Sequence, residues 1–191
     1  MSAGVLLILC AAALAGYNTW EDRAAGAASD RVLGQVRAQI PSGVERPAVQ
    51  AQGEGTAAAE PLVAVKAGGR SYLGILEIPA LDLTLPILSK WSYPNLKAAP
   101  CRYRGSAAGG DFIIAGHNYE SHFGQLKTLE TGAAVLFTDA DGAVYAYEVS
   151  EVEVLDGSAV TEMSAGDWDL TLFTCTVGGA QRVTVRCGLI G

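Results

Sequence analysis

Residues 171–186 of this chain read TLFTCTVGGAQRVTVR, and this stretch predicts a β-hairpin. Both flanks are rich in Val, Thr, Leu and Phe, which favour strands. Gly178 and Gly179 between them indicate a two-residue turn, because both central positions of such a turn require a positive φ. In the resulting register Cys175 lies directly opposite Arg182, and opposed residues of an antiparallel pair project from the same face. The hairpin therefore brings a thiol next to a permanent cation.

This pairing indicates chemistry as well as structure. A neighbouring cation favours the thiolate and offers a charge-assisted donor to a developing oxyanion. The competing interpretation is structural, because a cysteine in an apolar strand is often only a small buried side chain. The same register sets Val177 opposite Ala180 and Arg186 opposite Thr171. We expect Arg186 to be solvated.

A cysteine nucleophile needs a proton carrier, and the chain contains only two histidines. His117 follows the apolar segment 111–115, at the point where a predicted strand gives way to a loop. Asn118 and Tyr119 stand next to it and are expected to orient its ring. His122, at the start of a short helix predicted near residues 122–129, is the alternative. We expect His117 to act as the general acid and base.

The composition argues against several functional classes of protein. The 191 residues are 50% hydrophobic and carry a net charge of −7, with no basic cluster, which argues against nucleic-acid binding. None of the four cysteines forms a C-x-x-C pair, so we expect no metal site and no cofactor. A bridge between Cys101 and Cys187 is an open alternative to two buried thiols.

The N-terminal segment 1–20 is predicted to be a membrane anchor. Residues 5–15 are continuously apolar, Tyr17 and Trp20 suit a membrane interface, and the first charged residue is Glu21. A secretory signal peptide is the alternative, although a basic n-region and a clear cleavage pattern are missing. Either interpretation carries the residues that follow across a membrane.

Two further regions follow this segment. Residues 21–70 are predicted to form a helical stretch, ending before Pro41, and then a flexible arm rich in Ala, Gly and Pro. Residues 71–191 form the folded domain, an all-β barrel or sandwich with short helices. Its expected strands, besides the two of the hairpin, lie at residues 72–78, 81–85, 111–115, 134–138 and 144–154.

Four motifs together resemble the sortases, the cysteine transpeptidases of Gram-positive bacteria. Residues 171–175 match the T-L-x-T-C motif of that family, and residues 182–186 look like its arginine strand. Residues 115–118 look like its histidine segment, and residues 76–87 resemble its opening strands. The resemblance covers about residues 71–188, and the motifs are specific in combination.

The resemblance implies an eight-stranded β-barrel preceded by an N-terminal helix and linker. It implies that Cys175 is the nucleophile, His117 the general acid and base, and Arg182 the clamp for the oxyanion and substrate. Such an enzyme cleaves an LPxTG-like sorting signal between Thr and Gly through a thioester. An amine of a cell-wall precursor or a protein then accepts the acyl group. The expected location is the extracellular face of the plasma membrane, and no nucleic-acid partner is expected.

The chain departs from part of the family pattern. The arm lacks the Asp-Pro-aromatic lid motif of pilin-polymerising sortases, and no C-terminal membrane helix follows the last strand. A housekeeping or single-substrate enzyme, class D-like rather than class B, is therefore expected. Two alternatives stay open: a non-catalytic membrane-anchored β-domain such as an adhesin or receptor, and a different cysteine peptidase.

Overall fold

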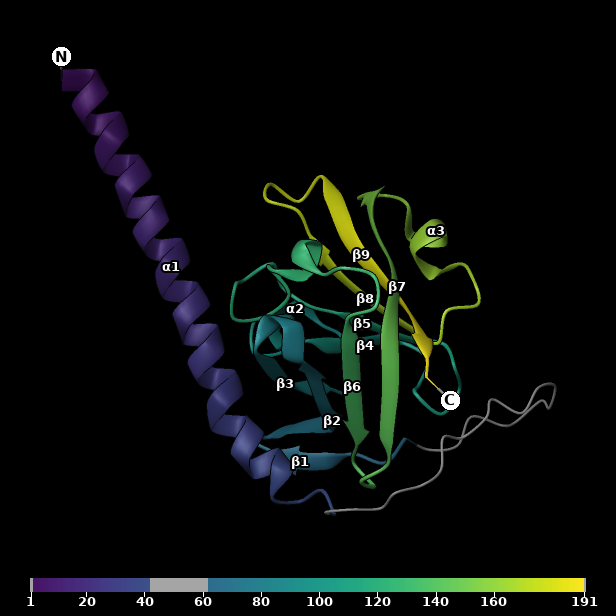
Figure 1. Ribbon diagram of the computed structural model, residues 1–191. Coiled ribbons are helices and arrows are strands. Elements are labelled where there is room, and N and C mark those ends of the chain that lie inside the picture. The colour runs from purple at the N-terminus through teal and green to yellow at the C-terminus, as the bar shows by residue number, and fades with distance from the viewer. Residues whose placement is uncertain (1, 42–61, 191) are drawn as a thin grey trace.

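The computed structural model describes residues 2–41 and 62–190, which form a β-barrel with a long helix along its side (Figure 1). The helices are α1 (Ser2–Arg37), α2 (Tyr93–Leu96) and α3 (Val160–Ser164), with short 3-10 turns η1 (Pro79–Leu81) and η2 (Leu126–Thr128). The strands are β1 (Val65–Ala67), β2 (Arg70–Ile78), β3 (Leu83–Leu88), β4 (Cys101–Arg104), β5 (Phe112–Ala115), β6 (Ala134–Asp139), β7 (Val144–Asp156), β8 (Leu170–Cys175) and β9 (Gln181–Leu189).

Pairing of β6 with β2 closes the sheet into a barrel. The strand order is β1-β2-β3-β4-β5-β8-β9-β7-β6, and β2 pairs with both β3 and β6. Because β1 pairs with β2 at one end of this order, the other eight of the nine strands form the closed ring. The predicted eight-stranded β-barrel is therefore confirmed.

Two apolar clusters lie on the two sides of the barrel wall. The interior cluster takes inward-facing residues of most strands, such as Leu170 and Leu172 of β8. The outer cluster lies between the wall and the C-terminal half of α1, and it includes Val36, Tyr72 and Cys101. This alternation follows from the two-residue period of a strand.

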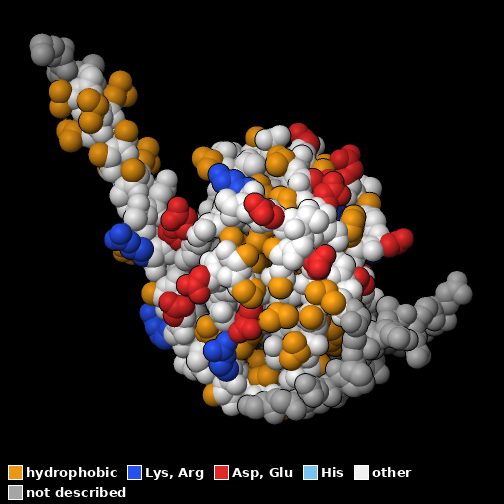
Figure 2. Space-filling view, in the orientation of Figure 1, with side chains coloured by type: hydrophobic (Ala, Val, Ile, Leu, Met, Phe, Trp, Pro, Cys, Tyr) orange, Lys and Arg blue, Asp and Glu red, His pale blue; other side chains and the backbone are white. Residues whose placement is uncertain are grey.

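The N-terminal helix α1 is one continuous element through Arg37, where two separate segments were predicted. Its first half projects beyond the barrel and is covered mostly by hydrophobic side chains, with charged ones beginning where the helix meets the barrel (Figure 2). Leu7 in this half is 71% exposed, whereas Val36 near the other end is fully buried. The sheet begins at β1, inside the predicted arm, and the rest of the arm, residues 42–61, lies outside the described residues.

Several local predictions were wrong for reasons that depend on neighbouring strands. Pro86 was expected to end a strand, but it lies inside β3 opposite Ile75. Since β3 pairs with β4 only at Leu88, Pro86 has no ladder partner on that side and its missing N–H is tolerated. The helix predicted at residues 122–129 is limited to the single turn η2.

The cysteines Cys101 and Cys187 are free thiols, so the alternative of a bridge is wrong. Cys101 belongs to the outer cluster and Cys187 to the interior one, on opposite sides of the barrel wall. Burial raises the pKa of each thiol to about 12. Both are therefore unreactive near neutral pH.

Arg186 was expected to be solvated, yet it is only 3% exposed. Its Nε donates to Glu153 Oε1 at 2.7 Å, and its Nη1 donates to the carbonyl of Met163 at 2.6 Å. Nη2 donates to the carbonyl of Glu162 at 2.9 Å. Nη1 also donates to the Thr171 hydroxyl of β8 at 3.2 Å. Four partners on three elements compensate the buried charge, so Arg186 holds α3 and the β7–β8 connection against β9.

His122, the alternative proton carrier, is fully buried. Within the described part of the chain neither of its ring nitrogens has a hydrogen-bond partner. Burial is the main cause that lowers the pKa of His122 to about 4, and the nearby His117 adds to the effect. The ring therefore stays neutral inside the fold.

Replacing Arg186 by alanine should destabilise the protein by about 2–4 kcal/mol, because Glu153 and two carbonyl groups lose their shared donor. Urea unfolding measures the loss. Arg104→Ala is the matched control, because Arg104 is exposed at the end of β4. Equal losses in the two variants would contradict the bracing role of Arg186.

Protonation of His122 should make the fold acid-labile. The unfolded chain binds this proton near pH 6.5, whereas the folded chain binds it only at about pH 4. Between these values the unfolded state holds more protons, so stability falls as pH falls, by up to about 1.4 kcal/mol per pH unit. His122→Phe should show a shallower decline in the free energy of unfolding. An unchanged slope would exclude His122 as the cause.

Candidate active site

The hairpin of β8 and β9 has the predicted register. Cys175 is paired with Arg182, and Thr171 is paired with Arg186. Phe173, two positions before Cys175, packs against the outer cluster, so alternation places the thiol on the outer face of the barrel. Cys175 is a half-buried free thiol, unlike the two fully buried cysteines.

The turn of this hairpin differs from the prediction by one position. Gly178 and Gly179 do have positive φ values, 86° and 77°. However, the N–H of Gly179 donates to the carbonyl of Thr176 at 2.8 Å, so the turn closes around Val177 and Gly178. This is the arrangement of a type II turn, which takes glycine at its third position. The two-residue turn between Val177 and Ala180 is therefore wrong, while the register of the strands is unaffected.

Parallel pairing of β5 with β8 positions His117 relative to Cys175. The last paired residues are Ala115 and Phe173, and the N–H of Gly116 continues the ladder to the carbonyl of Phe173 at 3.0 Å. His117 and Cys175 each lie two residues beyond this pair. Because neighbouring strands are about 4.8 Å apart, the two residues leave the sheet at the same end and at equivalent positions.

The ring of His117 is held by its own loop. It stacks on Tyr119, with ring centroids 4.4 Å apart and an interplanar angle of 14°. Burial is the main cause that lowers the pKa of His117; Lys97 lowers it further, while Asn118 and Glu21 act in the opposite direction. Burial and Lys97 favour the neutral imidazole. The contacts with Asn118 and Tyr119 agree with the expectation that these two residues orient the ring.

Arg182 braces the turn in this structure. Its Nη1 donates to the carbonyl of Gly179 at 2.9 Å and to that of Gln181 at 3.0 Å. A guanidinium has five N–H donors, so Nε and Nη2 retain donors for a ligand. The cation is thereby fixed to the loop next to the thiol.

An aromatic strip that was not predicted from the sequence begins at Phe173, two positions before Cys175 on β8. Tyr103 of β4 contacts Phe173 edge to face at 5.4 Å, and Trp91 continues the strip at 6.3 Å from Tyr103. Tyr93 lies 5.1 Å from Trp91 and is 72% exposed. The sequence does show two aromatic residues close together, at positions 91 and 93. Their place beside β8 depends on contacts with Tyr103 of β4, which the sequence does not reveal.

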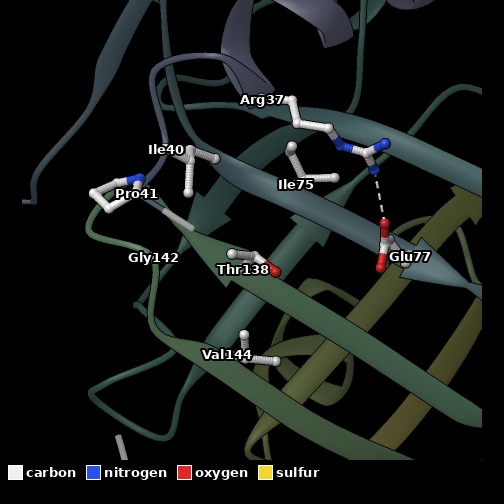
Figure 3. Close-up of a pocket in the computed structure, with 8 residues that line it drawn as sticks. All are labelled: Arg37, Ile40, Pro41, Ile75, Glu77, Thr138, Gly142 and Val144. Carbon is white, nitrogen blue, oxygen red and sulfur yellow. Dashed lines mark hydrogen bonds and ion pairs between the residues drawn. The ribbon is translucent and has the colours of Figure 1, made fainter. Parts of the chain in front are cut away.

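Two cavities lie away from this site. One of about 180 Å³ lies at the C-terminal end of α1, where Arg37 forms an ion pair with Glu77 at 2.9 Å (Figure 3). Another of about 740 Å³ lies at the start of β5, and Asp111 and Phe112 line it. Neither is lined by Cys175. In residues 2–41 and 62–190 no group of three or more His, Cys, Asp or Glu side chains could hold a metal ion.

Solved structures with the same fold were found, whereas no curated protein matches the chain. Sortase A from Corynebacterium diphtheriae is 23% identical with a TM-score of 0.58, and the match covers 64% of this chain and 62% of that one. A sortase D5 transpeptidase from Clostridium perfringens is 24% identical with a TM-score of 0.55, covering 63% and 79%. Sortase C of Clostridium perfringens, solved with the C-terminal cell wall sorting motif, is 22% identical with a TM-score of 0.55, covering 63% and 71%.

The match to the Corynebacterium enzyme thus spans less than two thirds of that chain. At these identities the structures establish the fold alone. The family follows from a sequence model of the sortase domain, which matches residues 76–190, more than half of the chain. That range includes both the β8–β9 hairpin and the strand that leads to His117. The chain belongs to the sortase family.

Proposed function

We propose that this protein is a cysteine transpeptidase in which Cys175 is the nucleophile, His117 the general acid and base, and Arg182 the oxyanion donor. The observation that supports it is the meeting of three strand ends: Cys175 opposite Arg182 on the hairpin, and His117 at the equivalent position of the parallel neighbour. Nucleophile, proton carrier and cation are the parts that acyl transfer through a thioester requires.

The first half-reaction forms the thioester. The Cys175 sulfur attacks the carbonyl carbon of the Thr–Gly peptide bond in an LPxTG-like signal, and the carbonyl oxygen becomes an oxyanion. Arg182 donates to that oxygen through the N–H groups not engaged by the turn. His117 takes the proton of the Cys175 thiol as the sulfur attacks, and it gives that proton to the departing glycine nitrogen as the C–N bond breaks. The product is an acyl group on Cys175 and a free amine.

The second half-reaction transfers the acyl group to an amine. His117, now neutral, removes a proton from the incoming amine of a cell-wall precursor or a protein. The new C–N bond forms as the C–S bond breaks, and the thiolate is regenerated. The aromatic strip of Trp91, Tyr103 and Phe173 gives apolar residues of the peptide a surface beside the thiol.

The helix α1 supports the proposed location. The helix over Gly4–Arg37 is long and apolar enough to cross a membrane, and Tyr17 and Trp20 are 54% and 64% exposed where its apolar half ends. Aromatic side chains at that place are typical of a membrane interface. We infer that α1 anchors the protein with its barrel on the outer face of the plasma membrane. The division into anchor, arm and barrel domain and the class D-like assignment stay predictions.

Cys175→Ala should abolish thioester formation and transfer, and Arg182→Ala should lower kcat by about 10²–10³-fold because one oxyanion donor is lost. The full chain in detergent or nanodiscs is incubated with a library of LPxTG-like peptides and a panel of amines. Mass spectrometry detects the acyl-enzyme and the transfer product.

Arg104→Ala, an exposed arginine at the end of β4, is the control and should keep wild-type turnover. Turnover that survives Cys175→Ala would refute the nucleophile assignment. A wild-type enzyme that forms no acyl adduct with any peptide of the library would refute the transpeptidase proposal.

The pKa of His117 should lie below 6.5 and should rise when Lys97 is removed. Burial is the main cause of the lowered pKa, and the Lys97 ammonium adds to it. Lys97→Met removes that cation and also frees Glu21, whose negative charge favours the protonated ring. NMR titration of the His117 ring measures the midpoint, with Lys127→Met at an exposed position as the control. A lower midpoint in Lys97→Met would contradict this assignment of charges.

A further inference from the structure

The helix α1 touches the loop that follows His117. Asp22 Oδ1 accepts a hydrogen bond from the N–H of Ser121 at 3.1 Å, and the Ser121 hydroxyl lies within hydrogen-bond distance of both Asp22 Oδ1 and the Asp22 carbonyl. Both residues are half-buried. A carboxylate that accepts a backbone N–H and a hydroxyl fixes the position of that short loop segment.

The two backbones approach closely at the same place. A Cβ added to Gly26, one helical turn after Asp22, would lie 3.0 Å from Ser121 Cβ. At position 26 a residue larger than glycine would push against the loop at Ser121. Glu21 of α1 forms an ion pair with Lys97 at 3.2 Å. After burial, Glu21 is also the main cause that raises the pKa of Tyr119.

The loop that follows His117 is closed by backbone hydrogen bonds, so its residues are held in fixed positions relative to His117. The N–H of Phe123 donates to the carbonyl of His117 at 3.0 Å, and the N–H of Gly124 donates to that of Tyr119 at 2.8 Å. Tyr119 in turn stacks on the His117 ring. A shift of Ser121 therefore has to move Tyr119 and with it the imidazole.

We propose that Asp22 is a positioning residue for His117, so that the N-terminal helix is a working part of the active site. The proposal rests on the proposed function of His117. The charged and titratable groups around that ring come from three elements: Glu21 of α1, Lys97 after α2, and Tyr119 and His122 of the loop itself. Asp22 acts through its bonds to Ser121.

This contact also fixes where the site lies relative to a membrane. Trp20, at the end of the apolar half of α1, precedes Asp22 by two residues, or about 3 Å along the helix. The His117 loop is therefore at the level where α1 leaves the bilayer. Figure 1 shows the β8–β9 hairpin at the same end of the barrel, the end toward which the free half of α1 projects.

The test compares two substitutions of Asp22 in the full chain. Asp22→Ala removes the acceptor and should lower kcat about tenfold with little change in KM. It should also raise the His117 midpoint toward 6.5, because the ring becomes less buried. Asp22→Asn removes the same charge but keeps an acceptor oxygen, so it should stay near wild type. Asp30→Ala, an exposed aspartate of the same helix, is the control.

If Asp22 had only a structural role, Asp22→Ala would lower the denaturation midpoint of the protein but would not shift the His117 titration of the folded protein. Wild-type kcat and titration in Asp22→Ala would overturn the proposal, and so would an Asp22→Asn variant as impaired as Asp22→Ala. If Asp22→Ala does not fold, the Gly26→Leu variant is tested in its place. The larger side chain pushes Ser121 away, so the pH midpoint of the His117 titration should again rise. The titration needs no turnover, so a wild-type enzyme without transpeptidase activity refutes the proposed function and leaves this test intact.

Discussion

The parallel pairing of β5 with β8 is the contact on which the rest of the site depends. Two segments that are distant in the sequence end at the same edge of the barrel because their ladder stops at Ala115 and Phe173. A parallel pair requires a long connection, and here that connection includes β6 and β7, which close the barrel against β2. Barrel closure and the meeting of His117 with Cys175 are therefore two results of one topology.

Alternation along the strands decides what each face can do. On β8 and β9 the inward residues Leu172 and Val185 complete the core, so the outward residues are available for polar contacts. Arg186 uses that outer face to hold α3, and Arg182 uses it to brace the turn. Two arginines four positions apart on one strand thus have different surroundings. Arg186 is buried and makes four hydrogen bonds, whereas Arg182 is half-buried and keeps donors for a ligand.

The sequence was most informative where the interactions are local. The register of Cys175 and Arg182 depends on a short loop between two adjacent strands, and it was predicted correctly even though the turn closes one position earlier. The burial of Arg186, the place of Pro86 inside β3 and the aromatic strip at Tyr103 were missed. Each depends on an element from elsewhere in the chain, and neither composition nor periodicity contains that information. The position of His117 at the end of a predicted strand favoured it over His122 as the proton carrier, and the resemblance to sortases implied the same residue.

The continuity of α1 changes how the N-terminal region is understood. A separate anchor and a flexible spacer would leave the barrel free to turn relative to the membrane. In the structure one helix runs from the apolar segment to Val36 in the outer cluster. Contacts at Asp22 and Ser121, at Glu21 and Lys97, and at Arg37 and Glu77 spread along the docked half. The docked half of α1 is therefore fixed against the barrel, beside the loop that follows His117.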